Sequence, residues 1–123
     1  MTASLIAGLR RQCGGPRDGA LLRFALGEAL RDAGELSAAI DELHRALGFD
    51  PLYSAAWKQL GRACLAAERP AEAANAWRQG IDAASRRGDR QAEKEMAVFL
   101  RRLERAGLHA PDGSTGSAPG RGP

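Results

Sequence analysis

The sequence repeats itself at a spacing of 34 residues through the middle of the chain. The matching positions are Leu26 with Leu60, Gly27 with Gly61, Ala29 with Ala63, Ala33 with Ala67, Ala39 with Ala73, and the apolar pair Leu43 with Trp77. A repeat of this length is typical of a helix pair that cannot bury its apolar face alone and stacks on a copy of itself. We therefore expect an all-α protein, a short α-solenoid of helix–turn–helix repeats.

The second copy carries a longer motif. It reads Trp57-x2-Leu60-Gly61-x2-Cys64, followed by Ala73-x3-Trp77. This motif resembles the tetratricopeptide repeat (TPR), in which W-x2-L-G-x2-Y precedes A-x3-F and a proline. The first copy has Arg23 in place of the leading tryptophan and ends at Pro51. The resemblance is to a small bacterial-type TPR protein, covers residues 20–87, and implies repeats at about 20–53 and 54–87.

Small residues stand where the two helices of each repeat must meet. Gly27 and Gly61 allow a close approach, and larger apolar side chains fill the space beside them, as close packing requires. The structural role of both tryptophans, Trp57 and Trp77, is therefore burial in the core, since large apolar residues at helical spacing usually form a buried stripe.

Capping and helix-breaking residues predict where the helices begin and end. Asp18 is expected to cap the second helix, Gly48 to end the third, and Asp50-Pro51 to open the fourth. Gly34 and Gly88 are expected to end their helices in a left-handed conformation. The predicted helices span about 3–12, 19–32, 36–47, 51–66, 70–87 and 89–106.

Two repeats are fewer than such stacks usually need, so the outer helices are expected to complete the fold. Residues 3–12 would stand in for half of a preceding repeat, with Leu5, Ile6 and Leu9 facing the stack. Residues 89–106 would form a capping helix with one apolar and one polar face. We thus predict one domain over residues 1–106. Residues 107–123 are rich in Gly, Ser and Pro, a composition that predicts a disordered tail.

The charge pattern favours a solvated surface over a nucleic-acid site. The net charge is +3, and the arginines gather at Arg86, Arg87 and Arg90 and at Arg101, Arg102 and Arg105. Acidic residues alternate with them and no aromatic platform accompanies them, so nucleic-acid binding is the weakest alternative. No apolar run is long enough to span a membrane, no signal peptide is recognisable, and two cysteines are too few for a disulfide framework. We expect a cytoplasmic protein.

The sequence offers no catalytic or cofactor-binding constellation. His109 lies in the predicted tail, and His44 shares a helix face with Asp41, where a metal would still lack a third and fourth ligand. The glycine-rich stretches lack a phosphate-binding lysine between a strand and a helix. We therefore predict a protein that is not an enzyme and carries no cofactor or metal.

The resemblance implies a concave groove, lined by the first helix of each repeat, that binds a peptide or a partner segment. The partner-binding positions carried over from the family are Phe24, Glu28, Arg31, Lys58, Arg62 and Leu65, with Leu21 and Ala55 beside them. The family's lysine–asparagine clamp for a terminal carboxylate has no match at Phe24 and Glu28. Glu28 should lie near Arg62, where the two side chains either pair or contact the partner. We predict a monomeric adaptor for a protein partner, with self-association as the alternative.

Overall fold

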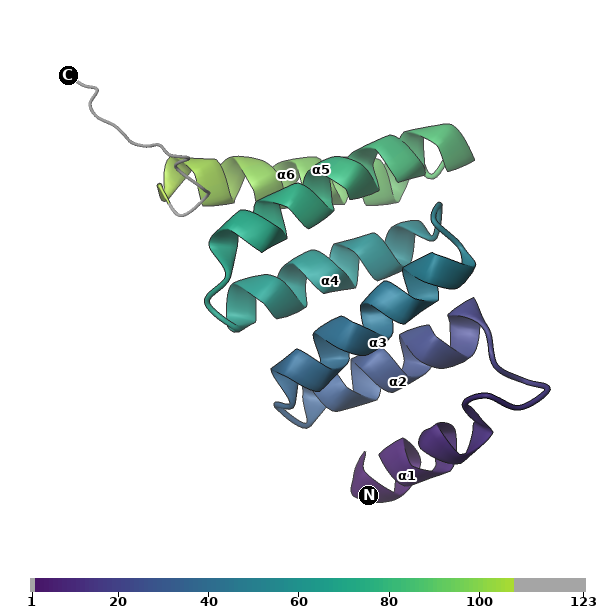
Figure 1. Ribbon diagram of the computed structural model, residues 1–123. Helices are drawn as coiled ribbons and strands as arrows, with labels where there is room; N and C mark the ends of the chain where they lie inside the picture. The colour runs from purple at the N-terminus through teal and green to yellow at the C-terminus, as the bar shows by residue number, and fades with distance from the viewer. Residues whose placement is uncertain (1, 108–123) are drawn as a thin grey trace.

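The computed structural model describes residues 2–107 of the chain, and within them every regular element is an α-helix. The helices are α1 (Thr2–Gln12), α2 (Ala20–Asp32), α3 (Leu36–Phe49), α4 (Ser54–Ala66), α5 (Pro70–Arg87) and α6 (Arg90–Arg105). Successive helices run back and forth along a stack (Figure 1). The predicted all-α solenoid is confirmed, whereas residues 108–123 of the predicted tail lie outside the described residues.

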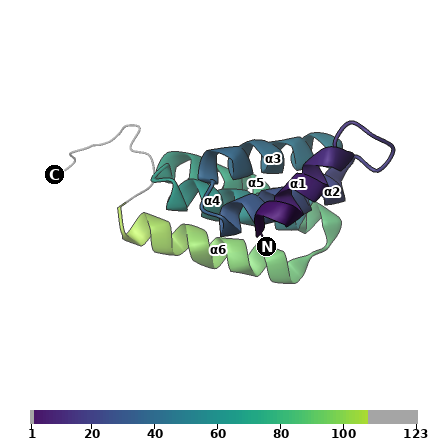
Figure 2. The same cartoon turned by 90° about the horizontal axis from the view of Figure 1, so that it is seen from below.

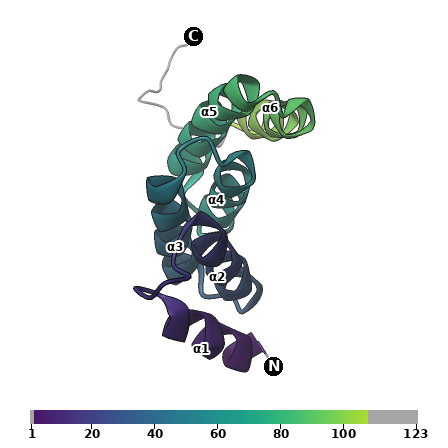
Figure 3. The same ribbon diagram turned by 90° about the vertical axis from the view of Figure 1, so that its right-hand side faces the viewer.

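The helices form two layers. Figure 3 shows α3 and α5 in one layer and α2, α4 and α6 in the other, with α1 against α2 at the N-terminal end. Figure 2, seen from below, likewise places α3 and α6 on opposite sides of the stack. α6 packs on α5 and also contacts α4, as the first helix of a further repeat would.

Each helix pair is held together by a glycine that faces a large side chain. A Cβ atom at Gly27 would lie 2.8 Å from Cγ of Leu43, and one at Gly61 would lie 2.1 Å from Nε1 of Trp77. The 34-residue spacing therefore repeats the same contact, with an indole in place of the leucine. The Nε1 group of Trp77 also donates to the carbonyl of Lys58 at 3.2 Å, which satisfies a buried polar atom.

The core runs through both layers. Its fully buried large side chains are Leu26, Leu30, Leu43, Leu60, Trp77 and Met96. Met96 fits over Gly80, where a Cβ atom would lie 2.4 Å from its sulfur. This contact fastens α6 to α5, and the repeat pattern gave no sign of it.

Both predicted tryptophans pack in the core, but they are buried to different degrees. Trp77 is 1% exposed, as expected. Trp57 is only partly buried, because its Nε1 group donates to the carbonyl of Pro51 at 2.8 Å and keeps the indole at the edge of the core. Leu5 is 54% exposed, so Ile6 is the buried residue of α1, with Leu9 partly buried beside it.

Three of the predicted helix boundaries are wrong. Asp18 does not cap α2, because its carboxylate binds the backbone N–H of Gly14 and the guanidinium of Arg23 instead. Gly48 does not end α3, which continues through this glycine to Phe49. Asp50 and Pro51 do not open α4 but belong to a turn that precedes it.

The turn before α4 is built by Asp50. Its Oδ1 atom accepts from the N–H of Leu52 at 3.1 Å, and its carbonyl accepts from the N–H of Tyr53 at 3.1 Å. This pattern, in which an aspartate side chain replaces a helical hydrogen bond, is common in turns. α4 therefore begins three residues after the proline, at Ser54.

The remaining predicted signals are confirmed. Gly34 and Gly88 have left-handed φ angles of 80° and 77°, and each ends its helix. Pro70 stands at the start of α5, and the Asp89 side chain accepts from the N–H of Ala92 to cap α6.

Candidate partner-binding groove

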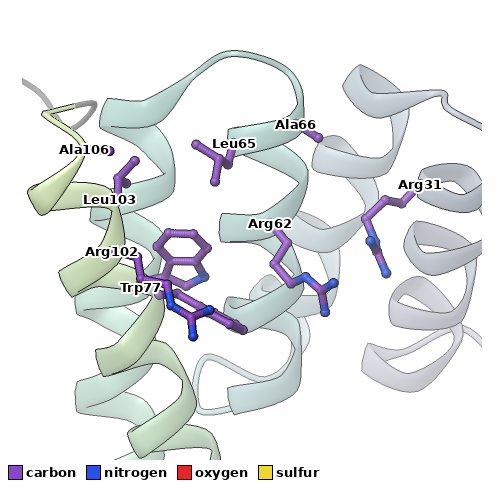
Figure 4. A pocket seen from close by; sticks show the side chains of 9 residues that line it. Arg31, Arg62, Leu65, Ala66, Trp77, Arg102, Leu103 and Ala106 are labelled. Atoms are coloured by element: carbon purple, nitrogen blue, oxygen red, sulfur yellow. The ribbon is translucent and has the colours of Figure 1, made fainter.

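The layer of α2, α4 and α6 carries an open pocket of about 510 Å³, which we call the groove pocket (Figure 4). It is lined by Arg31, Arg62, Leu65, Ala66, Trp77, Phe99, Arg102, Leu103 and Ala106. Because these residues come chiefly from α4 and α6, the final helix forms one wall of the site.

The floor of the groove pocket is apolar and aromatic. The rings of Phe99 and Trp77 lie 5.4 Å apart between centroids and are tilted by 47°, a favourable geometry for two aromatic side chains. Leu103 is buried beneath them, while Leu65 keeps 37% of its surface exposed. An incoming apolar side chain would therefore find the partly exposed ring of Phe99, held in place by the buried Trp77, and the solvent-exposed Leu65.

Three guanidinium groups stand around this floor. Arg31 extends from α2, Arg62 from α4 and Arg102 from α6, as Figure 4 shows. The Cζ atom of Arg62 lies 5.9 Å from the centroid of the Phe99 ring, within reach of a cation–π interaction. Within residues 2–107, no carboxylate oxygen lies within 4.0 Å of the guanidinium nitrogens of Arg62 or Arg102.

The structure brings three of the six predicted site residues together in the groove pocket, namely Arg31, Arg62 and Leu65. The other three do not line it. Phe24 instead packs against Tyr53, with ring centroids 5.0 Å apart and ring planes tilted by 36°. Whether any of the six contacts a partner stays a prediction.

The charged positions of the predicted set pair differently from the expectation. Glu28 binds Arg31 on its own helix, with 3.4 Å between Oε1 and Nε, rather than Arg62. Lys58 binds Glu95 of α6, with 2.7 Å between Nζ and Oε1. Lys58 pairs with Glu95 because α6 approaches α4 closely enough to supply a carboxylate. The prediction considered only the two repeats and did not include contacts between α4 and α6.

Polar contacts tie α6 to the start of α4. The hydrogen bond from Lys58 lowers the pKa of Glu95, and the 2.7 Å bond from the Ser54 hydroxyl lowers the pKa of Asp89. Since both carboxylates are favoured in their charged forms, these contacts hold at neutral pH. They position the wall that carries Phe99 and Arg102.

The 34-residue period could have identified part of the missed site. Leu65 advanced by one period is Phe99, and Arg62 advanced by one period is Met96. Extending the repeat into α6 thus places Phe99 in the groove. Arg102 and Ala106 are not reached in this way, because they lie beyond the last groove position of the second repeat.

Neither a metal-ligand cluster nor an activated thiol is found within residues 2–107. No group of three or more His, Cys, Asp or Glu side chains within residues 2–107 is arranged to hold a metal ion. Burial raises the pKa of the Cys64 thiol to about 11, which disfavours a nucleophilic thiolate. None of the helices in this part of the chain has the length and apolar character needed to cross a bilayer.

Comparisons with known proteins find bacterial relatives. A family model described as a tetratricopeptide repeat matches residues 20–63. A TPR repeat-containing protein of Pseudomonas aeruginosa is 50% identical over 102 residues, which make up 83% of this chain and 97% of that protein. The solution structure of a Bordetella parapertussis protein is similar, with a TM-score of 0.71 and 43% identity over 86% of this chain and 89% of that one.

A crystal structure of MamA also matches, with a TM-score of 0.64 over 85% of this chain and 67% of that chain. Its sequence identity is 20%, so this likeness concerns the fold.

Proposed function

The chain belongs to the tetratricopeptide repeat family, a family of protein-interaction modules, and we propose that it binds a segment of a partner protein in the groove of α2, α4 and α6. Proteins of this family are generally non-catalytic, so the proposed role is that of an adaptor. The groove pocket is the observation that supports this role. It combines exposed apolar surface with polar groups at its rim, which is the usual composition of a binding site.

The opposite layer makes a weaker candidate. Its exposed arginines are engaged with carboxylates of neighbouring residues: Arg45 binds Glu42, and Arg86 binds Asp82. Phe49 is exposed there, but it lies at the end of α3 and lines none of the cavities described. The groove therefore offers both a pocket and arginine side chains that no carboxylate within residues 2–107 neutralises.

Affinity capture from the cells that express the protein tests the proposal. The groove variant combines Arg62→Glu with Leu65→Glu, and the matched control combines Arg45→Glu with Phe49→Glu on α3. Both variants change one arginine and one exposed apolar residue to glutamate, so they alter charge and surface equally. We expect the groove variant to lose about tenfold or more of the captured partner, and the control to retain it.

Circular dichroism of both variants must show the helical signal of the parent. Equal capture of the partner by the two folded variants would show that the partner binds outside the groove.

A further inference from the structure

The two ends of the groove differ in charge. At the end near the start of α4, Lys58 is neutralised by Glu95. At the other end, Arg62 and Arg102 have no carboxylate partner within residues 2–107. The groove is therefore balanced at one end and basic at the other.

The basic end coincides with the apolar floor. Arg62 lies over the Phe99 ring, and Arg102 lines the same pocket. Packing against an aromatic face leaves the edge of a guanidinium free to donate hydrogen bonds, and its planar fork matches a carboxylate. Apolar contact and anion recognition are thus available within one pocket.

From this arrangement we propose that the groove pocket binds an acidic partner segment with a bulky apolar side chain. The apolar side chain would pack on Leu65 and Phe99, and flanking carboxylates would meet Arg62 and Arg102. This inference rests on the proposed function and adds the chemistry of the partner to it. Charge complementarity selects the occupant, since clustered like charges at the rim repel each other until an anion binds.

The orientation of the segment follows from the same asymmetry. Acidic residues of the partner belong at the end of the groove near Ala106, because at the other end Glu95 already neutralises the positive charge of Lys58. A basic segment meets the opposite pattern and is disfavoured at the pocket.

Three dye-labelled, end-blocked peptides test this proposal by fluorescence anisotropy with the full-length protein. The first carries central leucines flanked by glutamates. The second has lysines in place of the glutamates, and the third has serines in place of the leucines. We expect the first peptide to bind about tenfold more tightly than either of the others, and to weaken as salt is raised.

Two double variants locate the binding. Arg62→Glu with Arg102→Glu changes the pocket, whereas Arg101→Glu with Arg105→Glu changes two exposed arginines of α6 outside it. Both variants change the net charge by the same amount. We expect the pocket variant to lose about tenfold or more in affinity for the acidic peptide, and the control to lose about twofold at most.

Several outcomes would overturn the proposal. Equal losses of affinity in the two variants would indicate non-specific electrostatic attraction. Equal affinity for the three peptides, or no binding of any of them, would rule out an acidic partner segment with an apolar side chain. Binding that appears only after residues 108–123 are removed would identify the chain's own segment as the occupant. Binding lost as the protein self-associates would identify a second copy. If groove variants still abolish capture of the cellular partner, the proposed function stands without this partner chemistry.

Discussion

At the residue scale, the contact between Gly61 and Trp77 sets the spacing of α4 and α5. A Cβ atom at position 61 would lie within 2.5 Å of three indole atoms, far closer than atoms pack in proteins. We predict that Gly61→Ala lowers the free energy of unfolding by about 1–3 kcal/mol, the usual cost of overpacking a core. Urea denaturation followed by circular dichroism measures it.

Gly48→Ala is the matched control for this prediction. Gly48 lies in α3, and a Cβ atom at this position would meet open space, with no neighbouring atom within 4 Å. There the alanine should stabilise the protein by about 0.5–1 kcal/mol, because glycine disfavours helix. A Gly61→Ala protein as stable as the parent would disprove the close contact.

A second residue-scale prediction concerns the ion pairs of Arg23. Its guanidinium binds Asp18 and Glu42, and the hydrogen bonds from Arg23 are the main reason that the pKa of Asp18 falls from 3.8 to about 2. A carboxyl whose pKa is lowered by folding stabilises the protein above its unfolded pKa. That contribution is lost as the pH falls from about 4 to about 2.

We predict that Asp18→Asn destabilises the protein at pH 7, and that the difference from the parent shrinks as the pH falls through this range. Unfolding free energies measured across the acid range test it, with Asp41→Asn on the exposed face of α3 as control. A constant difference down to about pH 2 would show that the Asp18 charge contributes nothing.

Individual residues were predicted best where the repeat itself carried the signal. Gly61 and Trp77 stand one period after Gly27 and Leu43. The same glycine-to-large-residue contact could therefore be predicted independently from each of the two repeats. Asp18 was misjudged because two reasonable partners compete for one carboxylate, and Arg23 lies close enough to take it. Sequence alone does not rank such partners, since their distances depend on the folded loop.

At the element scale, the ends of the helices follow the repeat more closely than their starts. Gly34 ends α2 in the left-handed region, and Glu68 ends α4 in the same conformation with φ of 61°, one period later. At both ends the backbone forms the same pair of hydrogen bonds, for instance from the N–H of Arg69 to the carbonyl of Cys64. A side chain in this conformation costs about 1–2 kcal/mol.

Glu68→Gly should therefore raise the unfolding free energy by about 0.5–1 kcal/mol, the relief of strain being partly offset by the greater freedom of glycine in the unfolded chain. Gly34→Ala is the reciprocal change and should lower stability by a similar amount. Thermal and urea unfolding of both proteins measure the effect. If Glu68→Gly proves destabilising, the left-handed end of α4 is not strained.

The start of α4 shows the limit of local signals. Asp-Pro is a good opening for a helix, yet here the aspartate accepts from the N–H of Leu52 and also binds Arg87 of α5 at 2.8 Å. The second contact spans 37 residues and exists only once the stack has formed. Long-range partners of this kind decide between two turn geometries that the local sequence allows equally.

At the scale of the whole molecule, the fold was predictable because the repeat fixes helix lengths, order and pairing together. The binding site was predictable only in part, since one wall of the groove pocket is formed by α6. Its residues Phe99 and Arg102 were assigned to a cap, and Lys58 was assigned to the partner although Glu95 neutralises it. A binding site formed between a repeat and a divergent further copy cannot be located from a pattern that is derived only from the two well-matched copies.

The last prediction concerns the oligomeric state. α6 covers the open side of α5 by placing Met96, Ala92 and Leu103 in the core, so that flank has no large apolar surface left for a second chain. Four large apolar residues stay exposed within residues 2–107, and each comes from a different helix: Leu5, Leu21, Phe49 and Leu65. Stable homodimers need a contiguous and largely apolar interface.

We therefore expect a monomer of 13.0 kDa by light scattering over a wide range of protein concentration. The N-terminal end is where a dimer would form if one exists, since Leu5 and Leu21 belong to the outermost helix pair and Leu21 is 73% exposed. A dimer that persists on dilution, and separates when Leu5 and Leu21 are changed to glutamate, would make self-association through this end the better account of the protein. A dimer disrupted by Leu65→Glu would instead place the second copy in the groove, where it would compete with the acidic segment.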